Sequence, residues 1–221
     1  MSRKPRIAVV LSGCGVSDGA EIHESVLTLL AIDRQGGEYQ CFAPDIRQHD
    51  VVDHSSGKKM AETRNALVES ARIARGRIKD LASFNPGEFD ALVFPGGLGA
   101  AKTLCSFAND GPNCRVDPDV EKAIRSMHKA GKPIGALCIA PVILAKVTGE
   151  VELTIGHDPG TAKALEEMGA RHHAAGHGQV VLDRTHRIAT TPCYMLDSTI
   201  SQIADGADNV VKALLEMVEK K

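Results

Sequence analysis

One segment indicates both the fold and the candidate site of this chain: Pro133-Ile134-Gly135-Ala136-Leu137-Cys138-Ile139-Ala140. Residues 133–137 form a short apolar run typical of a buried strand, and a helical pattern follows from about residue 140 to 147. Cys138 therefore lies on a strand-to-helix turn, where its side chain projects at the carboxyl end of the strand. A cysteine there is suited to be a nucleophile, because the partial positive charge of the helix N-terminus favours the thiolate. The alternative is an inert buried cysteine, a common core residue.

Apolar runs alternate with helical patterns on both sides of this turn. Strands are expected at 6–11, 39–43, 90–94, 133–137 and 151–155, paired late strands at 180–182 and 187–190, and helices at 20–34, 63–75, 117–129, 140–147, 160–168 and 195–220. Asp117 is the expected N-cap of its helix, a small hairpin is expected around residues 56–57, and Gly206 is expected to interrupt the last helix. The alternation predicts βαβ units, and hence one α/β domain over residues 1–221 with a mostly parallel sheet and helices on both faces.

The composition excludes several classes of protein. The 221 residues carry a formal net charge of -2, so the chain lacks the excess of positive charge that binds nucleic acid or an anionic membrane. No apolar run is long enough to span a membrane, and the start of the chain lacks the apolar core of a signal peptide. The six cysteines form no CxxC motif or metal-ligand spacing, so we expect reduced thiols, a cytoplasmic location, and neither a metal nor an organic cofactor.

We expect the functional residues in four segments at the carboxyl ends of predicted strands: residues 12–15, 95–97, 137–139 and 190–192. Ligands of such sheets bind beyond the carboxyl ends of the strands. Gly96 and Gly97 expose backbone N–H groups there, and with the amide of Ile139 these are a candidate oxyanion hole. A plain turn that needs positive φ is the alternative for the two glycines. Cys14, Thr191 and Pro192, from neighbouring strand ends, are expected beside the substrate.

Three further side chains are candidates for proton transfer. Glu21 and Glu24 lie in the first turn of the first helix, where capping is one explanation and a carboxyl group aimed at the thiol is the other. A carboxyl group beside a thiolate has a raised pKa and can shuttle protons. His157 follows the fifth strand and is placed to orient or protonate a substrate oxygen, although a surface role is equally compatible with the sequence. For Cys14, the alternative to a position beside the substrate is a structural role, as a small residue that fits a tight turn.

Taken together, the motifs resemble one known group of proteins. They are Leu11-Ser12-Gly13-Cys14-Gly15-Val16, Gly19-Ala20-Glu21-Ile22-His23-Glu24, Cys41-Phe42-Ala43-Pro44-Asp45, Glu69-Ser70-Ala71-Arg72-Ile73, Phe94-Pro95-Gly96-Gly97-Leu98-Gly99, Gly131-Lys132-Pro133-Ile134-Gly135, Cys138-Ile139-Ala140-Pro141 and Thr190-Thr191-Pro192. The chain resembles the ElbB group (isoprenoid biosynthesis glyoxalase, or enhancing lycopene biosynthesis protein, or sigma cross-reacting protein) in the PfpI-like branch of the class I glutamine amidotransferase-like superfamily.

The resemblance implies a flavodoxin-like three-layer sandwich, a homodimer and specific site roles. Cys138 becomes the nucleophile, and the Gly-Ala-Glu-x-x-Glu stretch of the superfamily assigns the acid to Glu24 rather than Glu21. Gly97 with the Ile139 amide corresponds to the oxyanion hole. His157 matches the place where glyoxalase-active relatives carry a histidine.

Two differences from the motifs of the superfamily exclude activities that other members have. Intracellular proteases carry His directly after the cysteine, where this chain has Ile139, and glutamine amidotransferases carry His-x-Glu where this chain reads Thr191-Pro192-Cys193-Tyr194. We therefore expect glutathione-independent glyoxalase chemistry on small 2-oxoaldehydes such as methylglyoxal, through a cysteine hemithioacetal, with a link to isoprenoid biosynthesis by resemblance. The alternative is a regulatory protein that senses oxidants through Cys138, oxidised or joined to Cys14, without turnover.

Overall fold

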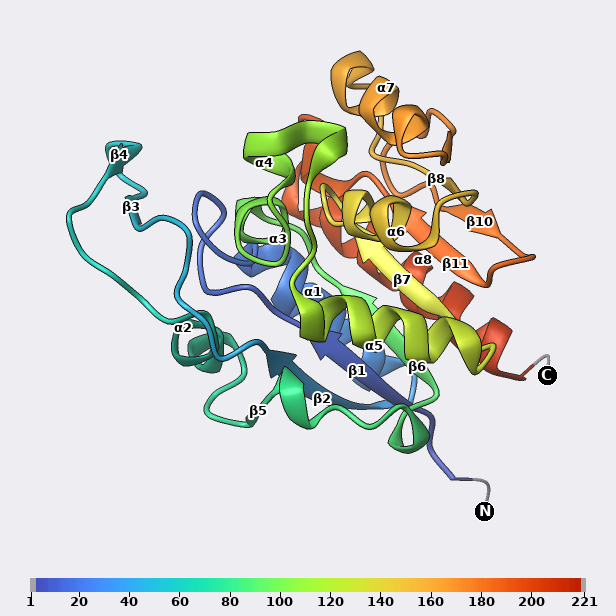
Figure 1. The fold of residues 1–221 in the computed structure, drawn as a ribbon. Helices are drawn as coiled ribbons and strands as arrows, with labels where there is room; N and C mark the ends of the chain where they lie inside the picture. The colour runs from blue at the N-terminus through green and yellow to red at the C-terminus, as the bar shows by residue number, and fades with distance from the viewer. Residues whose placement is uncertain (1–2, 220–221) are drawn as a thin grey trace.

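The most apolar strands of the sequence form the centre of one sheet. In the computed structural model, which describes residues 3–219, the sheet has seven strands in the order β10-β11-β7-β6-β1-β2-β5 (Figure 1). Their bounds are β1 (Arg6–Val10), β2 (Glu38–Ala43), β5 (Ile78–Asp80), β6 (Ala91–Phe94), β7 (Ile134–Leu137), β10 (Val181–Asp183) and β11 (Ile188–Thr191). Every residue of β6, β7 and β11 is buried, as expected for strands covered on both faces. All neighbours are parallel except β10 and β11.

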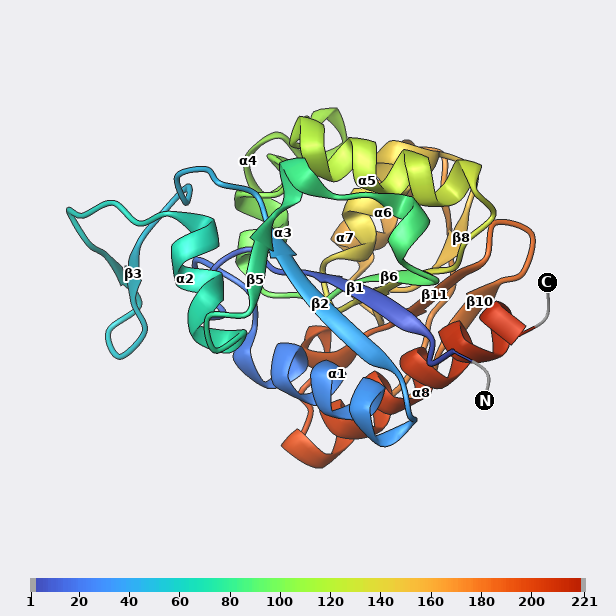
Figure 2. The ribbon, with the colours of Figure 1, turned by 90° about the horizontal axis from the view of Figure 1, so that it is seen from below.

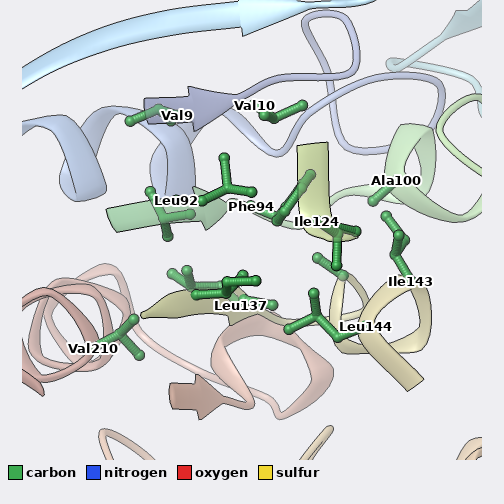
Figure 3. Close-up of a cluster of buried hydrophobic side chains, with 14 of the residues drawn as sticks. Val9, Val10, Leu92, Phe94, Ala100, Ile124, Leu137, Ile143, Leu144 and Val210 are labelled. Carbon is green, nitrogen blue, oxygen red and sulfur yellow. The ribbon is translucent and has the colours of Figure 1, made fainter. Parts of the chain in front are cut away.

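Helices cover both faces of this sheet, which gives three layers. Helices α1 (Ile22–Arg34) and α8 (Ile200–Glu219) pack together on one face, and α5 (Pro118–Lys129) and α6 (Pro141–Thr148) cover the other (Figure 2). Figure 3 shows the resulting core, in which Leu92, Phe94 and Leu137 of the central strands lie between Ile124 and Leu144 on one side and Val210 of α8 on the other. The predicted α/β, flavodoxin-like sandwich is confirmed.

The remaining elements are short and lie around the edges of the sheet. They are β3 (Val52–Asp53), β4 (Lys58–Lys59), α2 (Ala66–Ile73), α3 (Leu98–Lys102), α4 (Phe107–Asp110), β8 (Glu152–Leu153), α7 (Pro159–Glu167), β9 (Arg171–His172) and the 3-10 turns Leu81–Ser83, Pro86–Glu88, Gly111–Asn113 and Cys193–Met195. β3 and β4 form the small hairpin that the sequence predicted. Asp117 caps α5 as expected, accepting hydrogen bonds from the amides of Asp119 and Val120.

The strand predicted at residues 151–155 is present over Glu152–Leu153, but it does not join the central sheet. β8 pairs instead with β9 in a separate two-stranded sheet. The physical reason lies in side chains of the β10–β11 hairpin, which take the backbone donors of this segment. The Glu152 amide donates to Asp183 Oδ2 at 2.9 Å and the Thr154 amide donates to Thr190 Oγ1 at 2.9 Å. A regular ladder with β11 is therefore not formed there.

The C-terminal helix also differs from its prediction. Residues 193–195 form a 3-10 turn, α8 begins only at Ile200, and it runs through Gly206 without interruption. The predicted end at Lys220 lies outside the described residues. A Cβ at position 206 would lie 3.2 Å from both Cys193 Sγ and Thr191 Oγ1, so glycine here permits close packing of α8 on β11.

The apolar side chains of α1 differ in their burial. Leu29 and Ile32 are buried, whereas Ile22, Val26 and Leu30 are exposed. These three side chains recur every four residues and form an exposed apolar stripe along α1, at the end of which Leu30 lies beside residues of α8. No helix within the described part of the chain is long and apolar enough to cross a membrane.

Candidate active site

Cys138 lies on the turn that joins β7 to α6, with backbone φ of 60°. This left-handed conformation is uncommon for a residue other than glycine, and such outliers concentrate at functional sites. The turn is held by the Cys138 amide, which donates to the Thr191 carbonyl of β11 at 2.9 Å. The residue is 7% exposed, so Cys138 is buried at the carboxyl end of the sheet.

Glu24, in the first turn of α1, faces this sulfur. Its carboxylate accepts hydrogen bonds from the Gly96 amide at 2.9 Å and the Tyr194 amide at 3.2 Å, and it is hydrogen-bonded to the Cys138 side chain. The residue has no exposed surface. Glu21 serves as the N-cap of α1, its Oε2 accepting from the Glu24 amide at 2.7 Å. The two glutamates thus divide the two roles that the sequence left open: Glu21 caps, and Glu24 reaches the thiol.

Burial sets the protonation of this pair. Desolvation raises the pKa of Glu24 to about 7, and the negative charge of Glu21 acts in the same direction. Desolvation and the neighbouring Glu24 also raise the pKa of the Cys138 thiol well above its ordinary value. The sequence predicted that the helix N-terminus would favour the thiolate. The amides of Gly97 and Ile139 do donate to the sulfur and oppose the shift, but burial outweighs them, so the resting group is a thiol.

The two glycines after β6 make room for this arrangement. A Cβ at Gly96 would lie 2.4 Å from the Cys138 Cβ and 2.6 Å from Glu24 Oε2, so only glycine fits between the thiol and the acid. Gly97 has φ of 96°, and a Cβ there would lie 2.3 Å from the Glu21 amide nitrogen. With Gly97 so placed, its amide and that of Ile139 converge on the sulfur. Two convergent N–H donors beside a nucleophile can hold an oxyanion.

The structure brings only some of the other predicted residues into this site. Thr191 contributes its carbonyl, and Pro192 follows it, packed beside Gly156. Cys14 is half-buried in the β1–α1 loop, where Glu69 and Arg72 are its main charged neighbours. All six cysteines, each within residues 3–219, are free, so Cys14 and Cys138 are not joined.

His157 lies in the loop that precedes α7. Its side chain is exposed, and the group whose pKa it influences is His172. Its place in the chemistry stays a prediction. In the part of the chain that the structure describes, no three or more His, Cys, Asp or Glu side chains are grouped as metal ligands.

Two functional positions were missed from the sequence, and both belong to the turn after β11. The Tyr194 amide orients Glu24, and the Tyr194 hydroxyl lies 2.8 Å from His23 Nδ1. Cys193 has φ of 43°, and burial together with the nearby Glu24 raises the pKa of its thiol. The signal available was that both follow directly on Thr190–Pro192, a strand end already expected at the site.

Comparison with known proteins agrees with this architecture. The chain is 46% identical over 225 residues to the human "Glutamine amidotransferase-like class 1 domain-containing protein 3, mitochondrial", an alignment that covers 97% of this chain and 84% of that protein. It is 35% identical over 233 residues to the "ES1 protein, mitochondrial" of Danio rerio, covering 97% of this chain and 86% of that protein.

Solved structures show the same likeness. The crystal structure of an isoprenoid biosynthesis protein with amidotransferase-like domain from Ehrlichia chaffeensis matches with a TM-score of 0.90 and 38% identity, over 96% of this chain and 99% of that one. Glyoxalase III from Candida albicans shares the fold, with a TM-score of 0.63 at 14% identity over 96% of this chain and 97% of that chain. The model of the DJ-1/PfpI family matches residues 15–197, a span that contains Glu24, the two glycines and Cys138. This chain therefore belongs to the DJ-1/PfpI family, and the resemblance drawn from its motifs is confirmed.

Proposed function

We propose that this protein converts small 2-oxoaldehydes, such as glyoxal and methylglyoxal, into 2-hydroxy acids without glutathione. The observation that carries the proposal is the pair formed by Cys138 and the buried carboxyl group of Glu24, with the amides of Gly97 and Ile139 on the same sulfur. One nucleophile, one proton shuttle and one oxyanion site are the groups that such a conversion requires.

The first step uses the resting thiol and the Glu24 carboxylate. As the sulfur attacks the aldehyde carbon, the thiol proton passes along the hydrogen bond to Glu24 and an alkoxide forms on the former carbonyl oxygen. The Gly97 and Ile139 amides, which point at the sulfur in the free protein, then stabilise that oxygen. Return of the proton from Glu24 to the alkoxide gives a neutral hemithioacetal and regenerates the carboxylate.

The second step moves a hydrogen between two substrate carbons. The Glu24 carboxylate takes the proton from the hemithioacetal carbon, a C=C bond forms, and the electron pair of the neighbouring carbonyl shifts to its oxygen to give an enediolate. Glu24 then delivers the same proton to the second carbon while the hydroxyl proton of the first carbon passes to the second oxygen, which yields the thioester of a 2-hydroxy acid. Water cleaves this thioester, releasing glycolate or lactate and restoring the thiol. The sum is addition of water to the substrate with no external oxidant or reductant.

Two findings support this activity over others of the superfamily. Ile139 follows the cysteine, so the adjacent histidine of the peptidases is missing from the turn. The segment after β11 presents the Tyr194 amide to Glu24, where the glutamine amidotransferases carry a His-x-Glu base. Glyoxalase III from Candida albicans shows that this fold is used by a glyoxalase, and the Ehrlichia chaffeensis protein is described by its name as an isoprenoid biosynthesis protein.

The decisive experiment measures the product. Wild type and Cys138→Ala are incubated with methylglyoxal, and lactate is quantified together with its stereochemistry. Cys41→Ala is the matched control, because Cys41 is a buried thiol in β2 and takes no part in the proposed chemistry. We expect Cys138→Ala to form no lactate above the uncatalysed background and Cys41→Ala to retain turnover. Equal lactate yields from wild type and Cys138→Ala would refute the proposal.

We also propose that the protein is a homodimer in the cytoplasm. The exposed stripe of Ile22, Val26 and Leu30 supports the dimer, since a row of apolar side chains on one helix face is suited to pack on a second copy. The free state of all six cysteines supports a reducing compartment. Val26→Glu would place a charge within the stripe, and we expect it to lower the molar mass measured by light scattering to that of one chain. An unchanged mass would exclude this stripe as the interface.

A further inference from the structure

A second pair of thiols lies outside the candidate active site, in the segment between α3 and α5. Cys105 follows α3, Cys114 precedes α5, and their side chains are hydrogen-bonded to each other. Both are buried, at 4% and 2% exposure. The proposed reaction uses neither of them.

The backbone fixes the two thiols on one face of a short antiparallel ladder. Cys105 pairs with Val116, and the flanking hydrogen bonds run from the Ser106 amide to the Arg115 carbonyl and from the Asp117 amide to the Leu104 carbonyl, both at 2.9 Å. Cys105 and Val116 are thus a non-hydrogen-bonded pair, the arrangement in which opposite side chains approach most closely. Cys114 precedes Val116 by two residues and therefore shares its face.

The surroundings make the two thiols chemically unequal. The hydrogen bond from Cys105 lowers the pKa of Cys114, and the nearby Lys146 ammonium acts in the same direction, while burial and Asp110 oppose it. Lys146 is held there by donating to the Pro112 carbonyl at 2.9 Å. The hydrogen bond with Cys114 and burial both raise the pKa of Cys105. A thiolate paired with a protonated thiol is the combination that oxidises in two steps to a disulfide.

We propose that Cys105 and Cys114 form a reversible disulfide when the protein meets a hydroperoxide. The Cys114 thiolate attacks a peroxide oxygen, the O–O bond breaks, and Cys114 becomes a sulfenic acid as the peroxide leaves as water or alcohol. Cys105 then attacks that sulfur and gives up its proton, the S–O bond breaks, and water leaves. The two sulfurs supply the two electrons that reduce the peroxide, and thiol–disulfide exchange with an external thiol returns them.

The pair is connected to both helices that begin at the candidate active site. The Cys105 thiol lies 3.3 Å from the Ala100 carbonyl of α3, and Lys146, beside Cys114, belongs to α6. Helices α3 and α6 are in contact, and Figure 3 shows Ala100 and Ile143 near each other where they meet. The disulfide would therefore form between the segments that support Gly97 and Cys138, at a site distinct from both.

The test is a measurement on the wild-type protein. After brief treatment with hydrogen peroxide, the chain is denatured, its free thiols are alkylated and it is digested with trypsin. The tryptic peptide 103–115 contains Cys105 and Cys114 and no other cysteine. We expect this peptide to lose the mass of two hydrogen atoms and to escape alkylation, whereas the peptide that carries Cys41, a buried thiol raised in pKa to about 12, stays alkylated. Cleavage before Asp110 separates the two cysteines, so only a disulfide holds the fragments together until a reductant is added.

Single substitutions distinguish the roles of the two sulfurs. With Cys105→Ser, we expect Cys114 to stop at the sulfenic acid and to be trapped by dimedone. With Cys114→Ser, we expect Cys105 to remain a thiol. Cys138→Ala should form the disulfide as the wild type does, which separates this proposal from the proposed enzymatic function. Complete alkylation of both cysteines in wild type, under conditions that oxidise Cys138, would overturn the proposal without reference to any variant.

Discussion

The carboxyl group of Glu24 and the thiol of Cys138 are hydrogen-bonded to each other in a site from which water is almost excluded. The acid comes from the first turn of α1 and the thiol from the turn after β7, so the contact joins residues more than a hundred positions apart. Burial raises the pKa of both groups, and one proton therefore lies between two acceptors that are each reluctant to carry charge. This coupling has consequences for activity and for stability.

Activity should depend on the ionisation of Glu24. Because the carboxylate must take the thiol proton, we expect kcat/KM for methylglyoxal to rise with pH and to level off above the Glu24 pKa of about 7. Glu24→Gln offers no base, so we expect its kcat to fall by roughly a hundredfold or more. Initial rates of lactate formation across pH 5–9 measure both effects. A wild-type profile that is flat across this range would show that Glu24 is not the base.

The stability of the folded state should also depend on the Glu24 proton, but it should fall with rising pH where activity rises. The folded protein holds the Glu24 proton up to about pH 7, whereas the unfolded chain releases it near the ordinary value of 4.5. The folded state therefore binds more protons between these values, and its stability falls as the pH rises through them. The expected loss is roughly 3 kcal/mol, since each pKa unit corresponds to about 1.4 kcal/mol.

Urea unfolding at several pH values measures this effect, with Glu24→Gln as the reference. Other titrating groups contribute equally to both proteins, so the difference between their free energies of unfolding isolates Glu24. We expect the wild type to lose stability relative to Glu24→Gln from pH 4.5 to 7 and no further change above pH 8. Parallel pH profiles for the two proteins would contradict the raised pKa.

Gly96 should tolerate no side chain. Gly96→Ala would place a methyl group 2.4 Å from the Cys138 Cβ, and relief of that contact must move the thiol away from Glu24. We expect a loss of about 1–3 kcal/mol in stability and loss of lactate formation. Gly160→Ala, in α7, is the control, because a Cβ there would lie an ordinary 3.6 Å from Asp158 Oδ1. Retained activity in Gly96→Ala would mean that the thiol and the acid need not touch.

Removal of the α5 cap should affect stability alone. Asp117→Ala deletes the acceptor for the Asp119 amide at 3.0 Å and the Val120 amide at 3.2 Å. We expect the protein to lose about 1 kcal/mol of stability, and Asp117→Asn, which keeps an acceptor, to lose less. Thermal unfolding measures the difference, and kcat/KM for methylglyoxal should stay at the wild-type value. A fall in kcat/KM for Asp117→Ala would show that α5 communicates with the site.

Fold prediction succeeded for strands whose own residues indicate that they are buried. Residues 134–137 are apolar without alternation, residues 188–191 begin with Ile188 and Ala189, and both segments are fully buried strands of the sheet. The strand predicted at residues 151–155 lies outside the central sheet, which the sequence did not indicate, because its hydrogen bonds to Asp183 and Thr190 depend on side chains more than thirty positions away. Gly206 was expected to break α8, but local propensity gave way to the close packing that glycine allows against Thr191 and Cys193.

Part of the candidate site was likewise predicted from sequence, and part was missed. Cys138 was identified from the strand-to-helix turn, and Glu24 was distinguished from Glu21 only by the resemblance to a known group of proteins. The Tyr194 amide was missed because a backbone donor has no signature in sequence. The direction of the Cys138 pKa was also misjudged, since the turn indicates helix amides but not how deeply the sulfur is buried.

The position of a thiol at the carboxyl edge of a parallel sheet follows from sequence alone, because strand and helix periodicities and the place of a cysteine between them are local properties. The chemical state of that thiol follows from packing. Desolvation, the approach of the Glu24 carboxyl group and the convergence of two amides on the sulfur arise when α1, β6 and β7 pack together, and the electrostatic energy of a group depends on all of its neighbours at once.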